Sequence, residues 1–464
     1  MLFSSPAFFI FFAVYFCFHL AVPPKYRLYL IICGSTIFYA WWRVEYVWLP
    51  YALMAIAYGG VRWMDQSDGA RRKRRATLAI VVLFLPLLFF KYTNFLYRDV
   101  LGPVFGRQGE LIHLPLPLGV SFVTFTLTAY IVDIYRRKYQ NRPGVSTVLA
   151  YVLFFPHLIA GPILRPDELI PQLERPRSRP LWRAAAPLAI FTIGLVKKLV
   201  FADPIAEAVD AVYRQSGSAP GGPAVLLAVY GFSVQIYCDF SGYTDMAIGL
   251  ALMLGVRLPN NFLRPYAATS IVDFWRRWHI TLSFWLRDYL YIPLGGSRHG
   301  RGQEARNIVT TMALGGLWHG ASWTFLVWGL FHGVGVAALH AIHHVFGRAR
   351  ALPKWLGVVI TFHFVTLAWI FFRAPTLHKV GEILGALATR RGWRGASGFV
   401  AANAFVLLLM AVFFLAHPFD DHRRIRIAAR SLRPEIFWPV ILLLWVLAIT
   451  VSQGNAAKFI YFDF

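Results

Sequence analysis

A histidine in an apolar segment is the first candidate for chemistry in this chain. His319 lies in LGGLWHGASWTF, and the stretch from Asn307 to Trp318 contains no charged side chain. An imidazole with a pKa of about 6.5 can act as a general base, and a titratable group in such a setting is costly to keep in a membrane. The alternative is a histidine that hydrogen-bonds to a neighbouring helix. Position alone leaves both interpretations open.

The residues around His319 predict its depth and its neighbours. If a helix begins at Asn307 at the cytoplasmic face, His319 lies about 18 Å deep at about 1.5 Å per residue, near the middle of a hydrocarbon core about 30 Å thick. Trp318 is a candidate for orienting a substrate beside the imidazole. Three glycines predict room for that substrate: Gly315, Gly316 and Gly320.

A second polar group lies in SIVDFWRRWHITLSFWLRDYLYIPLGG. If this segment is a helix, His279, Ser283 and Arg287 share one face, because they are four residues apart. Arg276 and Arg277 are candidates for orienting a substrate. Tryptophan and arginine beside polar groups are also typical of an ordinary helix at the membrane interface, and the residues alone favour that interpretation.

Two carboxylates form a third group, in QIYCDFSGYTDMAIGL. Asp239 and Asp245 are six positions apart, so they do not share a regular helical face, and Ser241 lies between them. Carboxylates in a membrane segment need partners, and we expect Arg276, Arg277 or water. They could orient a catalytic histidine or be structural, and the residues alone slightly favour a structural role.

Three weaker patterns also contain polar side chains that could bind a ligand or carry an acyl group. His340, His343 and His344 have the spacing of metal ligands, but no carboxylate lies near them, so we expect a solvated face and predict no metal site. Cys238 is a candidate acyl-carrying thiol, although a packed cysteine is commoner. The loop GGSRHGRGQEARN suits a phosphate-bearing ligand through its arginines, although such loops usually reflect topology alone. The candidate cofactor-binding residues are Arg298, Arg301 and Arg306.

Composition indicates which elements must position these residues. Of the 464 residues, 58% are hydrophobic and only 15% are charged, against about 25% charged in a usual soluble chain. The net charge of +24 comes from basic clusters between apolar runs, as the positive-inside rule expects, so nucleic-acid binding is not predicted. Apolar runs recur along the chain. They predict an all-α polytopic membrane protein that forms a single domain over residues 1–464.

The apolar runs predict about eleven transmembrane helices together with re-entrant or interfacial helices. Basic loops, the first at Lys25 and Arg27, place both termini outside the cytoplasm. If the predicted spans alternate, the basic loop of Arg390 to Arg394 would lie outside the cytoplasm, against the positive-inside rule. The side of the membrane on which this loop lies therefore stays open. Residues 151–180 read as a re-entrant element because Pro156 interrupts them. The short apolar stretches between residues 239 and 296 predict a wet cavity in this middle third.

Three segments closely resemble one known family. They are YCDFSGYTDMAIGLALMLG, FWRRWHITLSFWLRDYLYIPLGG and GGLWHGASWTFLVWGLFHG. They resemble the membrane-bound O-acyltransferases, in the bacterial branch that includes alginate O-acetyltransferase subunits and the D-alanyl transferase of teichoic acids. With LPLGVSFVTFTLTAYIVDIYR, FFPHLIAGPI and GLVKKLVFAD, the resemblance covers most of residues 115–335. The terminal KFIYFDF is closer to the alginate type.

The resemblance implies a ring of tilted helices around a central tunnel, with His319 as the family's invariant histidine. His279 is the second active-site position, with an orienting role. The implied reaction transfers an acetyl group from cytoplasmic acetyl-CoA for O-acetylation of an extracytoplasmic polysaccharide, in a bacterial inner membrane and without a bound cofactor. A periplasmic acetyltransferase or esterase-like protein and polysaccharide synthesis or export machinery are the expected partners. The alternatives are D-alanyl transfer to teichoic acid and a glycan transporter or flippase.

Overall fold

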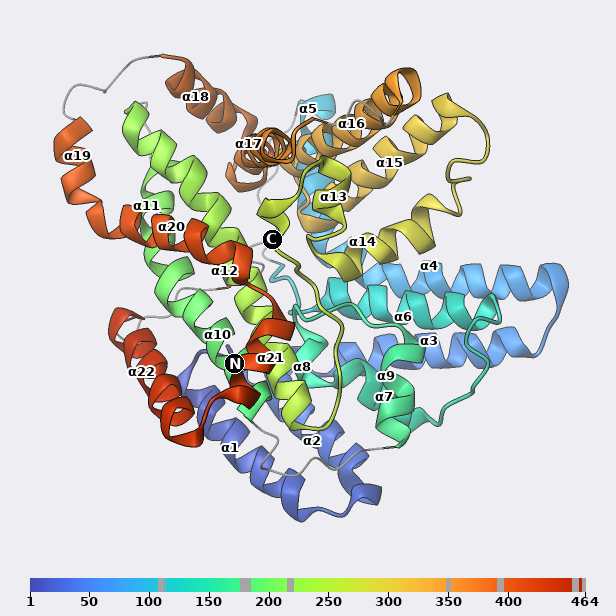
Figure 1. The fold of residues 1–464 in the computed structure, drawn as a ribbon. Helices are drawn as coiled ribbons and strands as arrows, with labels where there is room; N and C mark the ends of the chain where they lie inside the picture. The colour runs from blue at the N-terminus through green and yellow to red at the C-terminus, as the bar shows by residue number, and fades with distance from the viewer. Residues whose placement is uncertain are drawn as a thin grey trace. The chain divides into compact units, whose positions relative to one another are not determined.

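The computed structural model describes residues 1–106, 112, 114–175, 185–214, 221–347, 352–389, 396–452 and 459–460. These residues form helices and connecting turns, with no strand among them. A helix satisfies its own backbone hydrogen bonds, which a lipid-facing segment requires. The predicted all-α fold is therefore confirmed (Figure 1). The loop of Arg390 to Arg394 lies outside the described residues.

The structure divides into two compact units, which are described separately. The first comprises Met1–Phe191 and Ala247–Asn260, and the second comprises Thr192–Met246 and Asn261–Phe464. Two long helices, α10 (Ala185–Val196) and α12 (Gly222–Met253), each contribute residues to both units.

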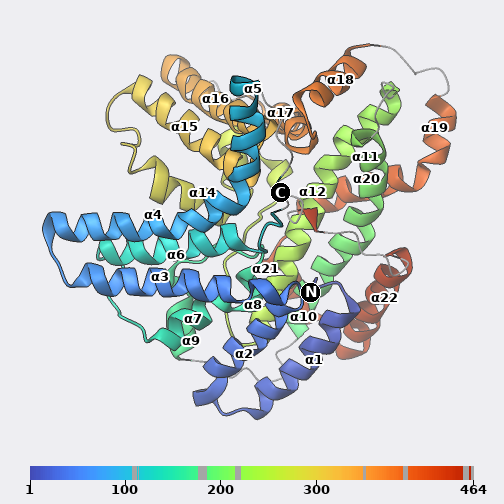
Figure 2. The same ribbon diagram turned by 180° about the vertical axis from the view of Figure 1, so that it is seen from behind.

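In the first unit, α3, α4 and α6 lie side by side (Figures 1 and 2). The chain breaks after α7, where Phe154 leaves the helical conformation before α8, so the predicted interruption around Pro156 is confirmed. The helices of this unit are α1 (Pro6–Ala21), η1 (Pro24–Tyr26), α2 (Arg27–Ala40), η2 (Val44–Tyr46), α3 (Trp48–Asp65), α4 (Gly69–Asn94), η3 (Phe95–Leu101), α5 (Gly102–Phe105), α6 (Val120–Tyr135), α7 (Val145–Leu153), α8 (Phe155–Leu158) and α9 (Pro166–Glu174).

The second unit holds the polar groups that the sequence singles out. Its centre is a helical hairpin of α15 (Arg301–His319) and α16 (Trp323–Phe346), with α17 (Lys354–Arg373) packed against α16. The other helices of this unit are η5 (Lys197–Ala202), α11 (Asp203–Tyr213), η6 (Pro265–Ala267), α13 (Ile271–Trp275), α14 (Ile280–Leu286), η7 (Arg287–Tyr291), α18 (Leu377–Ala388), α19 (Ala396–Ala402), α20 (Ala404–Ala416), η9 (His417–Phe419), α21 (His422–Ser431) and α22 (Pro434–Ser452).

Six helices of the described part are long and apolar enough to cross a membrane. The bent pair of α19 and α20, with an angle of 75°, raises this number to seven if it forms one span. The predicted count of about eleven is not confirmed. Two boundaries also differ from the prediction. The 32-residue helix α12 continues to Met253, into the region after residue 239 where only short apolar stretches were predicted. The helix of His319 begins at Arg301 rather than Asn307.

Candidate active site

His319 is the last residue of α15, at the closed end of the α15–α16 hairpin. Its side chain is 4% exposed, and its ring lies between Trp328 and Phe372, with centroids 5.2 and 5.3 Å away. Ser322 caps α16 by accepting a hydrogen bond from the backbone N–H of Phe325. The 19 residues of α15 place His319 about 27 Å from the start of the helix at about 1.5 Å per residue. The helix therefore begins six residues before Asn307, the start that the predicted depth of about 18 Å assumed, and the depth itself stays a prediction.

The glycines around His319 allow close packing instead of leaving room for a substrate. A Cβ on Gly316 would collide with the carbonyl oxygen of Phe325, and one on Gly320 would collide with the ring of Phe325. A Cβ on Gly315 would lie 3.1 Å from Leu286. Small residues let helix backbones approach closely. The space predicted at these three glycines is therefore wrong, because atoms of Phe325 and Leu286 occupy it.

His279 lies in the short non-helical turn between α13 and α14. Its φ angle of +42° is left-handed, a conformation that is uncommon for any residue other than glycine, although histidine adopts it more often than most. His279 precedes the first residue of α14 and is fully buried. The predicted continuous helix that aligns His279, Ser283 and Arg287 is therefore wrong, because the backbone turns at His279 and Arg287 is exposed.

Asn261 holds the imidazole of His279 in place. Its Oδ1 atom lies 3.2 Å from Nδ1 of His279 and accepts hydrogen bonds from the N–H and the hydroxyl of Thr281. Since Oδ1 only accepts, the Nδ1 atom carries the proton in this arrangement. Burial lowers the pKa of His279 from 6.5 to about 3. His279 is therefore a neutral imidazole near pH 7, with its lone pair at Nε2.

The structure brings the two predicted active-site histidines together. The ring centroids of His279 and His319 are 6.3 Å apart. Trp318 lies 6.3 Å from His279 and 5.0 Å from His319, measured between ring centroids. Phe240 of α12 contacts the other side of His279, with centroids 4.8 Å apart. Two buried imidazoles within an aromatic enclosure can together orient a hydroxyl group and remove its proton.

The two carboxylates of α12 pair with lysines and not with the predicted arginines. Lys198 Nζ lies 2.8 Å from Asp239 and 2.7 Å from Asp203, and the backbone N–H of Ile460 donates to Asp239 at 2.7 Å. Sequence reasoning missed both lysines, Lys197 and Lys198. The signal was a pair of lysines inside the apolar run GLVKKLVFAD.

The neighbouring lysine forms a second buried network. Lys197 Nζ lies 2.7 Å from Asp245 and 2.5 Å from Asp420. His422 contacts Asp245 through Nε2 at 2.7 Å, and the hydroxyl of Tyr237 contacts Asp420 at 2.5 Å. Both lysines begin the π-helical segment η5, a helix form that is common at functional sites. α12 can continue through Asp239 and Asp245 because each carboxylate has a partner.

The networks lie next to the histidines along α12. Phe240, which contacts His279, directly follows Asp239 in sequence. Phe459 packs on Tyr243 and Phe240, with ring centroids 4.6 and 6.1 Å apart. The described end of the C-terminal segment, residues 459 and 460, therefore contacts the same stretch of α12 as His279.

The four remaining residues predicted to orient a substrate differ in their exposure and in their contacts. Arg276 is exposed, and Arg277 pairs with Asp273 at 2.9 Å. Ser283 is half-buried, and its hydroxyl donates to the carbonyl of Trp278 at 3.3 Å. Ser241 is fully buried, and its Oγ atom has no hydrogen-bond partner within the described part of the chain.

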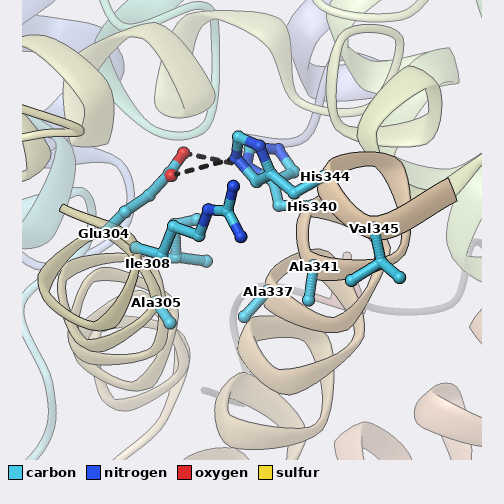
Figure 3. Close-up of a pocket in the computed structure, with 9 residues that line it drawn as sticks. Glu304, Ala305, Ile308, Ala337, His340, Ala341, His344 and Val345 are labelled. Atoms are coloured by element: carbon cyan, nitrogen blue, oxygen red, sulfur yellow. Dashed lines mark hydrogen bonds and ion pairs between the residues drawn. The ribbon is translucent and has the colours of Figure 1, made fainter. Parts of the chain in front are cut away.

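A small cavity marks the open end of the hairpin. It has a volume of about 110 Å³, and Arg301 is among its lining residues. Glu304 lies 3.0 Å from Nδ1 of His340 and 3.8 Å from Nε2 of His344 (Figure 3). The prediction that no carboxylate lies near these histidines is therefore wrong, because Glu304 of α15 contacts them across the hairpin. The candidate cofactor-binding residues Arg298, Arg301 and Arg306 are all exposed.

Comparisons with known proteins bear on the whole chain. The model of the MBOAT, membrane-bound O-acyltransferase family, matches residues 18–375. The chain is 39% identical over 407 residues to a probable alginate O-acetylase of Azotobacter vinelandii, covering 85% of this chain and 79% of that protein. It is 37% identical over 400 residues to a peptidoglycan O-acetyltransferase of Helicobacter pylori (80% and 76%). A teichoic acid D-alanyltransferase of Bacillus subtilis is 28% identical over 282 residues (56% and 69%).

Proposed function

Because the chain belongs to the membrane-bound O-acyltransferase family, we propose that this multi-pass membrane O-acyltransferase moves an acetyl group from cytoplasmic acetyl-CoA to an extracytoplasmic polysaccharide of the alginate type. The observation that carries the proposal is the buried pair of His319 and His279, with ring centroids 6.3 Å apart. Two relatives support acetyl transfer, since the proteins of Azotobacter vinelandii and Helicobacter pylori, 39% and 37% identical to this chain, are named for O-acetylation.

In the proposed reaction, His319 is the general base. The acceptor hydroxyl attacks the thioester carbonyl, His319 takes the hydroxyl proton, and the carbon–sulfur bond breaks. The proton then passes from His319 to the departing thiolate of CoA. His279, with its lone pair at Nε2, accepts a hydrogen bond from the hydroxyl and so positions it for attack. Trp318 packs against both imidazoles and orients the substrate beside them.

The buried charge network has a positioning role in this proposal. Asp239 forms an ion pair with Lys198 and accepts a hydrogen bond from the backbone N–H of Ile460. These contacts keep the neighbouring part of α12 in place, so that Phe240 packs against His279. Ser241 is proposed to orient substrate from the same helix, and Arg276, Arg277 and Ser283 are proposed to do so near α13 and α14. None of these polar side chains takes part in proton transfer.

The donor is proposed to enter from the cytoplasm. Its phosphates bind the exposed side chains of Arg298, Arg301 and Arg306 through charge-assisted hydrogen bonds. In this proposal a tunnel joins this side to the outside. There a periplasmic acetyltransferase or esterase-like protein passes the acetyl group on to the polysaccharide, alongside the polysaccharide synthesis or export machinery. The membrane is proposed to be a bacterial inner membrane, with both termini outside the cytoplasm and no bound cofactor.

The decisive experiment supplies labelled acetyl-CoA to the full-length protein in membrane vesicles and follows acetyl transfer to polysaccharide. His319→Ala should reduce transfer by a factor of about 10² to 10⁴, while His343→Ala, at an exposed position on α16, should leave it unchanged. In a second version of the experiment, a D-alanyl carrier protein replaces acetyl-CoA as the donor. Activity with the D-alanyl donor alone would contradict acetyl transfer. Normal acetylation with lost glycan export in His319→Ala would instead indicate a transporter.

A further inference from the structure

The short helix α21 presents a strongly cationic outer surface. It follows η9, whose Phe419 is 63% exposed, and ends just before α22. No acidic residue occurs between Asp421 and Glu435. Five exposed arginines occur within this interval: Arg423, Arg424, Arg426, Arg430 and Arg433.

The inner face of α21 is fixed to the second unit. His422 and Ala429 are buried, and Ile425 is half-buried between them. These three residues share one side of a helix because they are three and four positions apart. His422 contacts Asp245 at 2.7 Å. Arg423, Arg424 and Arg430 therefore point away from the packed face. Arg426, four positions after His422, lies beside that face and donates a hydrogen bond from Nε to the carbonyl oxygen of His422 at 3.2 Å.

The surroundings of α21 place it at a membrane surface. It connects α20 with α22, and both belong to segments apolar enough to cross a membrane. α22 is largely exposed, with Leu442 and Leu443 at 66% and 67%, as expected of a lipid-facing helix. A connection of this kind lies at the level of the lipid headgroups.

Apolar side chains accompany the arginines on the exposed side. Ile427 is 57% exposed and Leu432 is 39% exposed. Arg424 lies over the exposed ring of Phe419, with its guanidinium carbon 5.4 Å from the ring centroid. Arginine mixed with aromatic and aliphatic side chains is typical of helices that lie in the headgroup layer.

We propose that α21 is a docking surface for the phosphate groups of anionic phospholipids. Guanidinium groups bind phosphate oxygens through charge-assisted hydrogen bonds, and basic clusters on amphipathic helices are attracted to anionic lipid. The buried contact between His422 and Asp245 presents the arginines to the headgroups. None of the residues proposed for acetyl transfer lies on α21, so this surface is separate from the active site.

The test uses the full-length protein in nanodiscs. In a background with the exposed Cys17 and Cys33 replaced by serine, Ile427→Cys carries an environment-sensitive dye, while Cys238 is buried. Replacing phosphatidylcholine with phosphatidylglycerol should shift the dye emission. The triple variant R423Q/R426Q/R430Q should weaken the affinity for phosphatidylglycerol on the order of a hundredfold, at about fivefold per arginine, so that even nanodiscs of pure phosphatidylglycerol give little of the shift.

Controls separate charge, position and ligand source. R423K/R426K/R430K keeps the charge and should keep the shift. R71Q/K73Q/R74Q removes three exposed cations from α4 and should also leave the shift unchanged. Inorganic phosphate added to phosphatidylcholine nanodiscs should not reproduce it. The proposal is overturned if the glutamine variant of α21 responds normally, if the α4 variant loses the response equally, or if phosphate alone produces it.

Discussion

The side-chain oxygen of Asn261 lies 3.2 Å from Nδ1 of His279 and holds this ring beside His319. The same oxygen accepts two hydrogen bonds from Thr281, so Asn261 joins the turn before α14 to the imidazole. His279 has a left-handed backbone, and these bonds offset part of the cost of that conformation. Asn261 is therefore a positioning residue for the proposed reaction.

Asn261→Ala should lower kcat for acetyl transfer by about 10- to 100-fold, because a small misplacement of a catalytic group is costly. The KM for acetyl-CoA should stay within about twofold, because Asn261 contacts His279 and Thr281 and none of the arginines proposed to bind CoA. Thr281→Val is the matched control, since it removes one hydrogen bond to Asn261 and keeps the contact with His279. A rise in KM at normal kcat would contradict the positioning role.

The stability of the protein should depend on pH through His279. Its pKa is about 3 in the folded protein and 6.5 when unfolded, so the unfolded chain binds more protons between these values. Stability is therefore lost as pH falls from 6.5 towards 3, by up to about 1.4 kcal/mol per pH unit. Thermal unfolding at a series of pH values should show a shallower acid loss in His279→Gln than in the unaltered protein. An identical slope in both proteins would refute this assignment, and His343→Ala, at an exposed histidine, should leave the slope unchanged.

Removing Lys198 should destabilise the second unit strongly. Its ammonium group is 4% exposed and pairs with Asp203 and Asp239, so Lys198→Ala leaves two buried carboxylates without their cation, at a cost of about 3–5 kcal/mol. Arg287→Ala removes an exposed ion pair with Asp288 and should cost at most about 1 kcal/mol. Urea unfolding in detergent compares the two variants. Equal midpoints would show that burial adds nothing to the lysine pair.

The closed end of the hairpin should not tolerate a larger residue at Gly316. A Cβ at this position collides with backbone atoms of α16, so Gly316→Ala should destabilise the protein by about 1–3 kcal/mol. Gly302 on the same helix has open space around it, and Gly302→Ala should be neutral or stabilising by up to about 1 kcal/mol. Melting temperatures measured together distinguish the two sites. A stable Gly316→Ala protein would mean that α15 and α16 can separate without cost.

Sequence patterns predicted the all-α membrane fold class. Hydropathy is a local property of the chain, so it indicates a membrane protein, but it predicted about eleven spans where six or seven in the described part are long and apolar enough. His319 and His279 are 40 positions apart, and their proximity followed from the family resemblance and is confirmed by the ring contact. Trp318 packs against both rings, and its role in orienting a substrate stays a prediction.

The sequence could not predict the partners of the carboxylates. Asp239 and Asp245 had nearby arginines at positions 276 and 277, but their cations come from Lys197 and Lys198, and Asp420 joins from much further along the chain. Such long-range pairing depends on tertiary packing. The break at His279 was missed for a related reason, because its left-handed backbone is held by Asn261 and has no glycine or proline to signal it.

The lysine pair also constrains how this protein is made. The segment Ala185–Tyr213 is apolar enough to enter a bilayer and carries two ammonium groups, of which only Lys198 has a counter-ion, Asp203, within the same segment. The other acidic partners are made later in synthesis. Asp239 and Asp245 are about 40 to 50 residues downstream, and Asp420 is more than 200 residues downstream. An unpaired lysine at the centre of an inserting helix costs about 3 kcal/mol on the insertion scale. Lys197 therefore carries this cost until Asp245 and Asp420 have been translated.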